Sequence, residues 1–187
     1  MKKRKVLILG SSGMLGHKLF QYLDSKKTIL VYGASRKNVL QHDNYISLNL
    51  ECGFEGLKET IDSVEPDVII NCVGAIKQKE YSLGDLFFLN TSLPLFIDDY
   101  SKVRRFRFIH ISTDCVFDGQ RGDYSEESLD YSYDCYGLSK RLGETISDHN
   151  LVIRTSIIGH EINGKLSLLD WFLSADDEVQ GYSNVMY

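Results

Sequence analysis

The chain has 187 residues, of which 43% are hydrophobic and 25% are charged, and its formal net charge at pH 7 is −5. This is the composition of an ordinary globular protein with enough apolar residues for one sizeable core. A mildly acidic chain is poorly suited to nucleic acid or to an anionic membrane surface, because both attract clustered lysine and arginine. We therefore expect neither nucleic acid nor a membrane among its partners.

One basic run, residues 2–5, stands near the N-terminus and is followed by the apolar stretch Val6–Leu9. This stretch is too short for a signal peptide, whose apolar region takes about 7–15 residues. No window approaches the ~20 apolar residues of a membrane span. We therefore expect a cytoplasmic protein. Its four cysteines show neither CxxC nor paired histidine spacing, so we interpret them as reduced thiols and predict no metal site.

Short apolar runs alternate along the chain with longer amphipathic segments. The apolar runs predict strands at Lys5–Leu9, Ile29–Tyr32, Tyr45–Leu48, Asp67–Asn71, Phe106–Ile111 and Leu151–Arg154. The amphipathic segments predict helices at Met14–Ser25, Gly56–Val64, Leu83–Tyr100 and Tyr136–Asp148, followed more weakly by a helix at Leu166–Leu173 and a short segment at Val179–Tyr182. This alternation predicts an α/β fold with a Rossmann-type, doubly wound parallel sheet and helices on both of its faces.

The heptapeptide GSSGMLG, Gly10–Gly16, follows the first predicted strand and opens the first predicted helix. Gly10 permits a tight turn, Gly13 allows the backbone to approach a pyrophosphate, and Gly16 lets the helix pack closely on the strand. Free N–H groups at the start of the helix would hold the phosphates. Because the loop stands between a strand and a helix, we interpret it as a dinucleotide site rather than a flexible turn.

The end of the second predicted strand indicates which dinucleotide binds. In proteins that use NAD, an acidic residue about 20 positions beyond the glycines holds the ribose 2′-hydroxyl. Here that place is taken by GASRK, residues 33–37, which contains no acid. Arg36 offers a planar fork and Ser35 a hydroxyl donor, and both suit a 2′-phosphate. We favour NADP(H) over NAD(H), and over the alternative of a solvated basic loop.

Polar residues also follow the fifth predicted strand, which ends at Ser112, Thr113 and Asp114. Parallel sheets bind ligands at the carboxyl ends of their strands, so Thr113 could hydrogen-bond a substrate carbonyl or the Tyr136 hydroxyl. For Ser112 and Asp114, capping of the loop is an alternative. The loop from Asp114 to Tyr133 has no helical or strand pattern, and its length predicts a functional segment.

Tyr136 and Lys140 are four residues apart on a predicted helix, which places both on one face. A free phenol has a pKa of about 10 and transfers protons poorly at neutral pH. A neighbouring ammonium favours the phenolate, so we expect Lys140 to lower the pKa of Tyr136. Taken alone, the pair could be a tyrosine packed on a lysine stem, but downstream of the glycine loop we interpret it as catalytic.

Together these motifs resemble those of the extended short-chain dehydrogenase/reductases, and within them the dTDP-4-dehydrorhamnose reductases and related nucleotide-sugar reductases. The resemblance runs in order along nearly the whole chain, through GSSGMLG, NCVGAI (Asn71–Ile76), LNTSLP (Leu89–Pro94), STDCVFDG (Ser112–Gly119), YGLSKRLGE (Tyr136–Glu144) and IRTSIIG (Ile153–Gly159). It implies an NADPH-dependent reduction of a 4-keto deoxysugar nucleotide in the synthesis of cell-surface polysaccharide sugars. It also implies that a nucleotide sugar is the substrate, and it allows a homodimer.

By position, the resemblance implies that Thr113, Tyr136 and Lys140 form the catalytic set. Tyr136 would give a proton to the keto oxygen, Thr113 would orient the carbonyl, and Lys140 would tune Tyr136 and contact the nicotinamide ribose. The resemblance and the glycine loop together imply a cofactor site made of Gly10, Ser12, Gly13, Met14, Leu15, Gly16, Ser35, Arg36, Asn49, Leu50, Cys72, Val73, Gly74, Asn90, Ser112, Tyr136, Lys140 and Thr155.

Two features depart from the family pattern. Cys115 stands where relatives usually carry a tyrosine near the sugar, which leaves the substrate preference open. The chain is also shorter than typical members. We therefore expect residues 1–159 to form the NAD(P)-binding Rossmann domain and residues 160–187 to begin a substrate-binding region that is largely missing. A chain shortened in this way could be inactive alone.

Two other functions share these motifs. An NAD-dependent nucleotide-sugar epimerase or dehydratase uses the same scaffold, but Ser35 and Arg36 argue against it because such enzymes usually prefer NAD. A regulatory subunit that binds NADP without catalysis has no need of Thr113, Tyr136 and Lys140, all of which are present. The sequence therefore favours the reductase.

Overall fold

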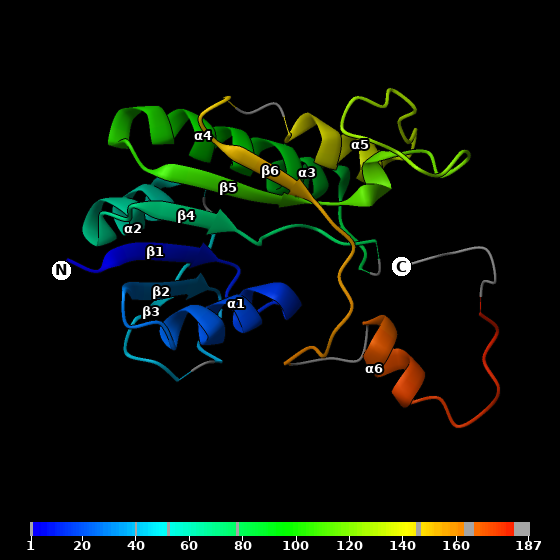
Figure 1. The fold of residues 1–187 in the computed structure, drawn as a ribbon, viewed down its shortest axis with the longest axis horizontal. Coiled ribbons are helices and arrows are strands. Elements are labelled where there is room, and N and C mark those ends of the chain that lie inside the picture. Colours follow the sequence, from blue (N-terminus) through cyan, green and yellow to red (C-terminus); the bar gives the residue numbers. More distant parts are fainter. Residues whose placement is uncertain are drawn as a thin grey trace.

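The computed structural model describes residues 2–39, 41–51, 53–77, 79–144, 147–162 and 167–181. Six parallel strands form one sheet in the order β3-β2-β1-β4-β5-β6 (Figure 1). Their bounds are β1 Arg4–Leu9, β2 Ile29–Ser35, β3 Tyr45–Ser47, β4 Val68–Asn71, β5 Arg107–Ser112 and β6 Leu151–Arg154. Each predicted strand is confirmed with small shifts at its ends, and the strand order confirms the predicted Rossmann-type sheet.

Helices connect these strands and cover the sheet. They are α1 Met14–Asp24, α2 Glu55–Val64, α3 Leu83–Phe87, α4 Leu93–Arg104, α5 Cys135–Leu142 and α6 Leu168–Leu173. On one face of the sheet, α2 and α4 pack over a core that includes Leu57, Ile97 and Phe108. On the other face, α1 packs on β1 and β2 through Phe20. Within the described residues, no helix is long and apolar enough to cross a membrane.

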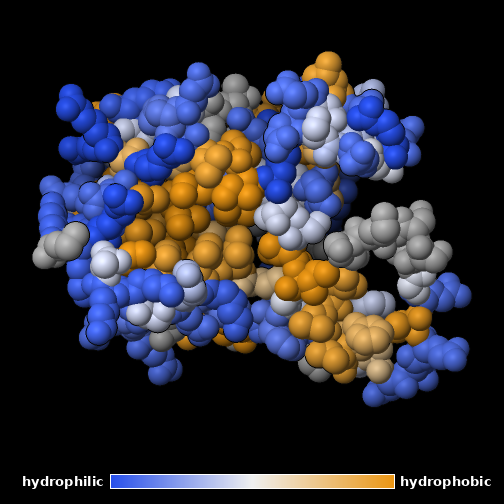
Figure 2. Space-filling view, in the orientation of Figure 1, coloured by the Kyte–Doolittle hydropathy of each residue, from blue (hydrophilic) through white to orange (hydrophobic). Residues whose placement is uncertain are grey.

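The face that carries α1 is only partly covered, in contrast to the predicted cover on both faces. Ile70, Ile109 and Leu151 are register partners on neighbouring strands, so their side chains point to the same side as the core residue Ile8. Leu151 is 41% exposed and Ile153 is 40% exposed. Figure 2 shows the resulting apolar surface over the middle of the sheet. In the described part of the chain, α1 covers β1 and β2 and leaves β5 and β6 open on this side.

The helix predicted over Leu83–Tyr100 is a longer helical run that a π-helical stretch, Phe88–Ser92, divides into α3 and α4. Pro94 gives a physical reason for the interruption. It has no N–H to donate to the carbonyl of Asn90 one turn earlier. That carbonyl faces α5 instead, since a Cβ built on Gly143 would lie 2.0 Å from the Asn90 oxygen. The π-helical stretch therefore brings Asn90 against α5.

The helix predicted over Tyr136–Asp148 ends earlier than expected. α5 stops at Leu142, and Gly143 is its C-cap. Gly143 lies so close to the backbone of Asn90 that no side chain fits there, and the helix ends where it meets this neighbour. Residues 145–146 lie outside the described chain.

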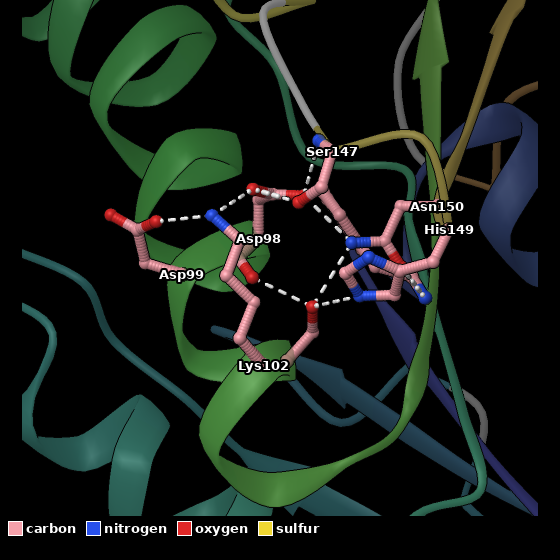
Figure 3. Close-up of polar contacts among 8 residues, drawn as sticks. Asp98, Asp99, Lys102, Ser147, His149 and Asn150 are labelled. Atoms are coloured by element: carbon pink, nitrogen blue, oxygen red, sulfur yellow. Dashed lines mark hydrogen bonds and ion pairs between the residues drawn. The ribbon is translucent and has the colours of Figure 1, made fainter.

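A buried carboxylate ties the segment after α5 back to α4 (Figure 3). Asp98 on α4 is 4% exposed and accepts hydrogen bonds from the N–H and hydroxyl of Ser147 and from the side chain of Asn150. Lys102 pairs with it at 3.0 Å. Burial alone raises the pKa of Asp98, but these donors outweigh it and bring the pKa to about 2. Because Asn150 also accepts the backbone N–H of Phe108, this cluster sets β6 beside β5.

The chain after β6 carries little regular structure. The helix predicted at Leu166–Leu173 is confirmed from Leu168 onward, whereas Leu166 lies outside the described residues. Trp171 and Phe172 are 47% and 55% exposed, so α6 presents an apolar surface to solvent. The segment predicted at Val179–Tyr182 forms no helix or strand at residues 179–181, and Tyr182 is not described.

Candidate active site and cofactor crevice

The loops that follow β1, β4, β5 and β6 lie at the carboxyl edge of the sheet. β1 stands between β2 and β4, so the connections run outward in opposite directions on its two sides. Open α/β sheets bind ligands at such a topological switch point. The candidate crevice therefore lies between the loop after β1 and the loop after β4.

The glycine loop after β1 has the close contacts that the sequence predicted. Gly10 has φ +77°, and a Cβ there would lie 3.0 Å from the carbonyl of Cys72. A Cβ on Gly16 would lie 2.2 Å from the Gly10 oxygen, so α1 packs directly on the turn. Gly13 is the N-cap of α1 and provides no side-chain cap, and the first turn of α1 holds no acid. The free N–H groups in the first turn of α1 fit a bound pyrophosphate. The other predicted loop residues, Ser12, Met14 and Leu15, are half-buried around this turn.

The end of β2 differs from the expectation for Ser35. This residue is 8% exposed, and its hydroxyl donates to the Lys37 carbonyl at 3.1 Å and lies 2.8 Å from the Tyr45 hydroxyl. The predicted donor to a 2′-phosphate is thus engaged inside the protein, because β3 places Tyr45 beside it. Arg36 is exposed and forms neither an ion pair nor a hydrogen bond with any described residue. Arg36 is thus a free donor at this end of the crevice, next to the exposed Lys37.

Asn49 and Leu50, predicted to lie beside the adenine, follow β3. Asn49 is exposed, and its side chain exchanges hydrogen bonds with Glu51 at 3.1 and 3.2 Å. Leu50 packs against the core beneath. In this turn the Leu50 side chain faces the core, and the polar Asn49 side chain faces solvent.

The structure brings Thr113 and Tyr136 together. Thr113 follows β5, and its hydroxyl oxygen accepts the N–H of Cys115 at 3.1 Å. Tyr136 is half-buried on the first turn of α5. Burial is the largest cause that raises the pKa of Tyr136 above its ordinary value, and Cys115 and Asp114 raise it further, whereas a hydrogen bond with Thr113 lowers it. The Tyr136 hydroxyl therefore stays protonated at neutral pH, which suits a proton donor.

Lys140 lies on α5 together with Tyr136, and its amine is buried against the loop after β4. It is 6% exposed, and a Cβ built on Gly74 would lie 2.6 Å from its Nζ. Burial lowers the pKa of Lys140 to about 8, with Glu144 and Cys72 acting in the opposite direction. The expectation that Lys140 lowers the pKa of Tyr136 is wrong for this structure, because burial dominates and the pKa of Tyr136 is raised. Lys140 instead places its amine in the floor of the crevice, against the loop after β4.

Asn90 and Cys72 lie next to this amine. The Asn90 side chain is fully buried, accepts the N–H of Ala75 at 2.9 Å and donates to the Ser139 hydroxyl at 3.0 Å. It thus supports the loop after β4 and α5 through internal contacts rather than from a free surface. Burial raises the pKa of the Cys72 thiol to about 12, although Lys140 opposes the shift. Cys72 and the half-buried Val73 therefore line the crevice as neutral groups.

A buried ion pair behind the crevice was missed by sequence reasoning. Glu144 accepts a hydrogen bond from Ser112 and binds Arg154 with both carboxylate oxygens, and the shortest contact between Arg154 and Glu144 is 2.7 Å. The Ser112 hydroxyl, predicted to meet the cofactor, is thus directed to Glu144. Glu144 stands one helical turn after Lys140 at the end of the motif YGLSKRLGE, but neither signal indicated Arg154 as its partner. The Glu144–Arg154 pair joins α5 to β6 behind the catalytic side chains.

Thr155 lies in a segment that closes over the same edge of the sheet. Its hydroxyl donates to the Ser156 carbonyl, and the Ser156 hydroxyl donates to Asp114 at 2.7 Å. Farther on, a Cβ on Gly159 would lie 3.7 Å from Met14 of the glycine loop. The segment after β6 therefore reaches from the turn after β5 to the start of α1. Among the described residues, no group of three or more histidine, cysteine or acidic side chains is placed to hold a metal ion.

A Rossmann-type sheet, a glycine turn at its switch point and a Thr-Tyr-Lys set at the same edge define a protein of the extended short-chain dehydrogenase/reductase class. The family model described as RmlD substrate binding domain matches residues 4–168. The chain belongs to this family.

Curated relatives share a modest fraction of the sequence. A dTDP-4-dehydrorhamnose reductase from Aggregatibacter actinomycetemcomitans is 28% identical over 161 residues, which cover 81% of this chain and 51% of the relative. The methionine adenosyltransferase 2 subunit beta of Xenopus tropicalis is 29% identical over 152 residues, covering 79% of this chain and 43% of that protein. The chain thus spans about half the length of the curated relatives it matches.

Solved structures are similar over the same part of the chain. A hypothetical dTDP-4-dehydrorhamnose reductase from Sulfolobus tokodaii is 34% identical with a TM-score of 0.69, covering 80% of this chain and 55% of that one. The dTDP-4-dehydrorhamnose reductase of Bacillus anthracis, solved in complex with NADP, is 24% identical with a TM-score of 0.70, covering 82% and 54%. At 24% identity, the similarity to the Bacillus anthracis structure supports a shared fold and nothing further.

Proposed function

We propose that the protein is an NADPH-dependent reductase of a 4-keto deoxysugar nucleotide, with residues 1–159 as its cofactor domain and residues 160–187 as the start of its substrate-binding region. The observation that carries the proposal is that Thr113 after β5, Tyr136 on the first turn of α5 and Lys140 against Gly74 lie at the carboxyl edge of the sheet that also holds the glycine turn. A raised pKa keeps the Tyr136 hydroxyl protonated until it meets a developing alkoxide. The dTDP-4-dehydrorhamnose reductases among the relatives are consistent with this assignment.

The residues present fit a dinucleotide. Gly10, with φ +77°, makes the tight turn that directs the chain into α1, and the start of α1 offers free N–H groups to a pyrophosphate. Arg36, exposed and unpaired among the described residues, would bind a 2′-phosphate. When bound, NADPH would supply the hydride for the reduction. These features favour NADP(H) over NAD(H).

In the reaction, Tyr136 donates its proton to the keto oxygen as negative charge develops there. Thr113 offers the Tyr136 hydroxyl an acceptor oxygen, because its own hydroxyl proton is donated to Asp114 at 3.2 Å. The Lys140 ammonium, with a pKa of about 8, is mostly protonated at pH 7 and places a positive charge in the floor of the crevice. From that position the ammonium would donate a hydrogen bond to the nicotinamide ribose of the bound cofactor.

Consumption of NADPH tests this proposal. Protein mixed with NADPH and a dTDP- or UDP-linked 4-ketosugar should lose NADPH absorbance in proportion to the reduced sugar formed. Sugar turnover without loss of NADPH would instead favour the epimerase reading.

A second candidate is a regulatory subunit that binds NADP without catalysis, since the relatives include the beta subunit of methionine adenosyltransferase 2. Tight NADPH binding with no reduction of any 4-ketosugar would favour it. Retention of Thr113, Tyr136 and Lys140 favours the reductase.

A further inference from the structure

A pocket opens beside Tyr136 between the loop after β4 and the start of α5. Its volume is about 430 Å³, within the range of pockets that bind small molecules. It is lined by Ile76, Lys77, Lys79, Tyr81, Leu86, Asp134, Cys135 and Tyr136. Two lysines face one carboxylate in this lining, so the pocket carries a net positive charge.

Lys77 is held in place over the tyrosine. Its Nζ donates to Asp134 at 2.8 Å and lies 5.3 Å from the centroid of the Tyr136 ring. Both partners of the ion pair are 47% exposed, and a pair this exposed contributes little to folding stability. The Lys77–Asp134 pair therefore contributes little to the stability of the fold. Its main effect is to hold the Lys77 ammonium group at the mouth of the pocket.

Asp134 does not depend on Lys77 for its own partners. It caps α5 by accepting the N–H of Gly137 at 2.7 Å, and it also accepts the Ser132 hydroxyl at 3.1 Å. Lys77 contributes one N–H to Asp134 and keeps two further N–H donors for a ligand. Lys79, on the same loop, forms no ion pair with any residue that the structure describes.

We propose that Lys77 and Lys79 bind an anionic oxygen group of the substrate, a phosphate or a carboxylate, while Tyr136 protonates its keto oxygen. The inference rests on the proposed function and adds a subsite to it. A cation already held by Asp134 loses little freedom when the anion binds. Charge-assisted hydrogen bonds from two ammonium groups would set the orientation of the sugar relative to Tyr136. In a nucleotide sugar the anion is the diphosphate, whereas in a free uronic acid it is the sugar carboxylate.

Calorimetric titration of the NADP-loaded protein tests the subsite without catalysis. The probes are dTDP and UDP for a diphosphate, glucuronic acid for a carboxylate, and thymidine as the uncharged reference. Lys77→Met and Lys79→Met keep an apolar stem and remove the charge. Lys77→Arg keeps the charge, and Lys58→Met removes a similar exposed lysine that pairs with Glu55 on α2.

Each Met variant at positions 77 and 79 should weaken binding of the anionic probe about tenfold. Lys77→Arg and Lys58→Met should leave it within twofold of the unchanged protein, and NADP binding should not change in any variant. A loss for dTDP and UDP alone identifies a diphosphate subsite, and a loss for glucuronic acid alone identifies a carboxylate subsite. The inference would be overturned if Lys77→Met and Lys79→Met bound every anion as tightly as the unchanged protein does. It would also be overturned if the unchanged protein bound no anion.

Failure of the proposed function is recognised separately. If the full-length gene product reduces no 4-ketosugar, the reductase assignment fails, and the anion titration still decides whether the two lysines form a subsite. If reduction proceeds and the lysine variants bind every anion normally, only the subsite is rejected.

Discussion

The empty side-chain position of Gly74 is what accommodates the amine of Lys140. A Cβ there would lie 2.6 Å from the Nζ of Lys140 and 3.1 Å from the Oδ1 of Asn90. The floor of the crevice thus depends on a glycine after β4 as much as on the lysine of α5. This relationship links the loop that would line the cofactor to the helix that carries Tyr136.

Gly74→Ala should therefore displace Lys140. We expect a loss of about 1–3 kcal/mol in the free energy of unfolding, the usual effect of overpacking, and at least tenfold weaker NADPH binding. Urea denaturation and fluorescence titration measure the two effects. Gly56→Ala on α2 is the matched control, because the nearest atom to its added carbon is 3.8 Å away. Normal NADPH affinity in Gly74→Ala would show that the contact does not shape the site.

Tyr136→Phe should reduce the rate of 4-ketosugar reduction by at least a hundredfold and leave NADPH affinity unchanged. Only the hydroxyl proton is removed, and general acid catalysis contributes about 10²–10⁴-fold. Steady-state kinetics with parallel cofactor titration separate the two effects. Tyr133→Phe, at a position that is 96% exposed, should change neither. Substantial residual reduction by Tyr136→Phe would remove Tyr136 from proton transfer.

Arg36→Ala should weaken NADPH binding by about tenfold or more and leave NADH binding almost unchanged, because only NADPH carries the 2′-phosphate. Competition titrations with the two cofactors provide the comparison. Arg107→Ala removes an exposed arginine from the start of β5, at the opposite edge of the sheet, and should affect neither cofactor. Equal losses for NADPH and NADH would contradict the NADP assignment.

The free energy of unfolding should rise with pH above about 8 through Lys140. Its folded-state pKa of about 8 lies below the ordinary 10.5, so between these values the unfolded chain binds more protons than the folded one. We expect about 1 kcal/mol of added stability between pH 7 and 9. Above pH 9 the raised pKa of Cys72 acts in the opposite direction. Lys140→Met should remove this rise and Lys58→Met should keep it, as measured by urea denaturation at each pH.

Asp98→Asn should destabilise the fold by about 2–4 kcal/mol, because the donors of Ser147, Asn150 and Lys102 would lose their buried anion. Asp99→Asn on the same helix is the control. That carboxylate is 80% exposed, and we expect a change within about 0.5 kcal/mol. Equal stability of the two variants would show that the cluster in Figure 3 does not hold β6 in place.

The sequence by itself determined the features that depend on neighbours along the chain. Apolar runs specified the strands, since a strand covered on both sides needs continuous apolar residues. The glycine spacing from Gly10 to Gly16 specified a turn that only glycines can form against the next helix. Helical periodicity put Tyr136 and Lys140 on one helix. The direction of the Tyr136 pKa was predicted wrongly, and the internal hydrogen bonds of Ser35 were not foreseen, because both depend on burial and on distant partners.

Tertiary structure decided where the charges lie. Glu144 meets Arg154, Lys77 meets Asp134 across 57 positions, and Lys140 meets the empty side of Gly74. None of these contacts leaves a periodic signal, because each joins separate elements at the carboxyl edge of the sheet. Burial then lowers the pKa of Lys140 and raises the pKa of Cys72, since the free energy of a charge depends on the water removed around it rather than on its sequence neighbours.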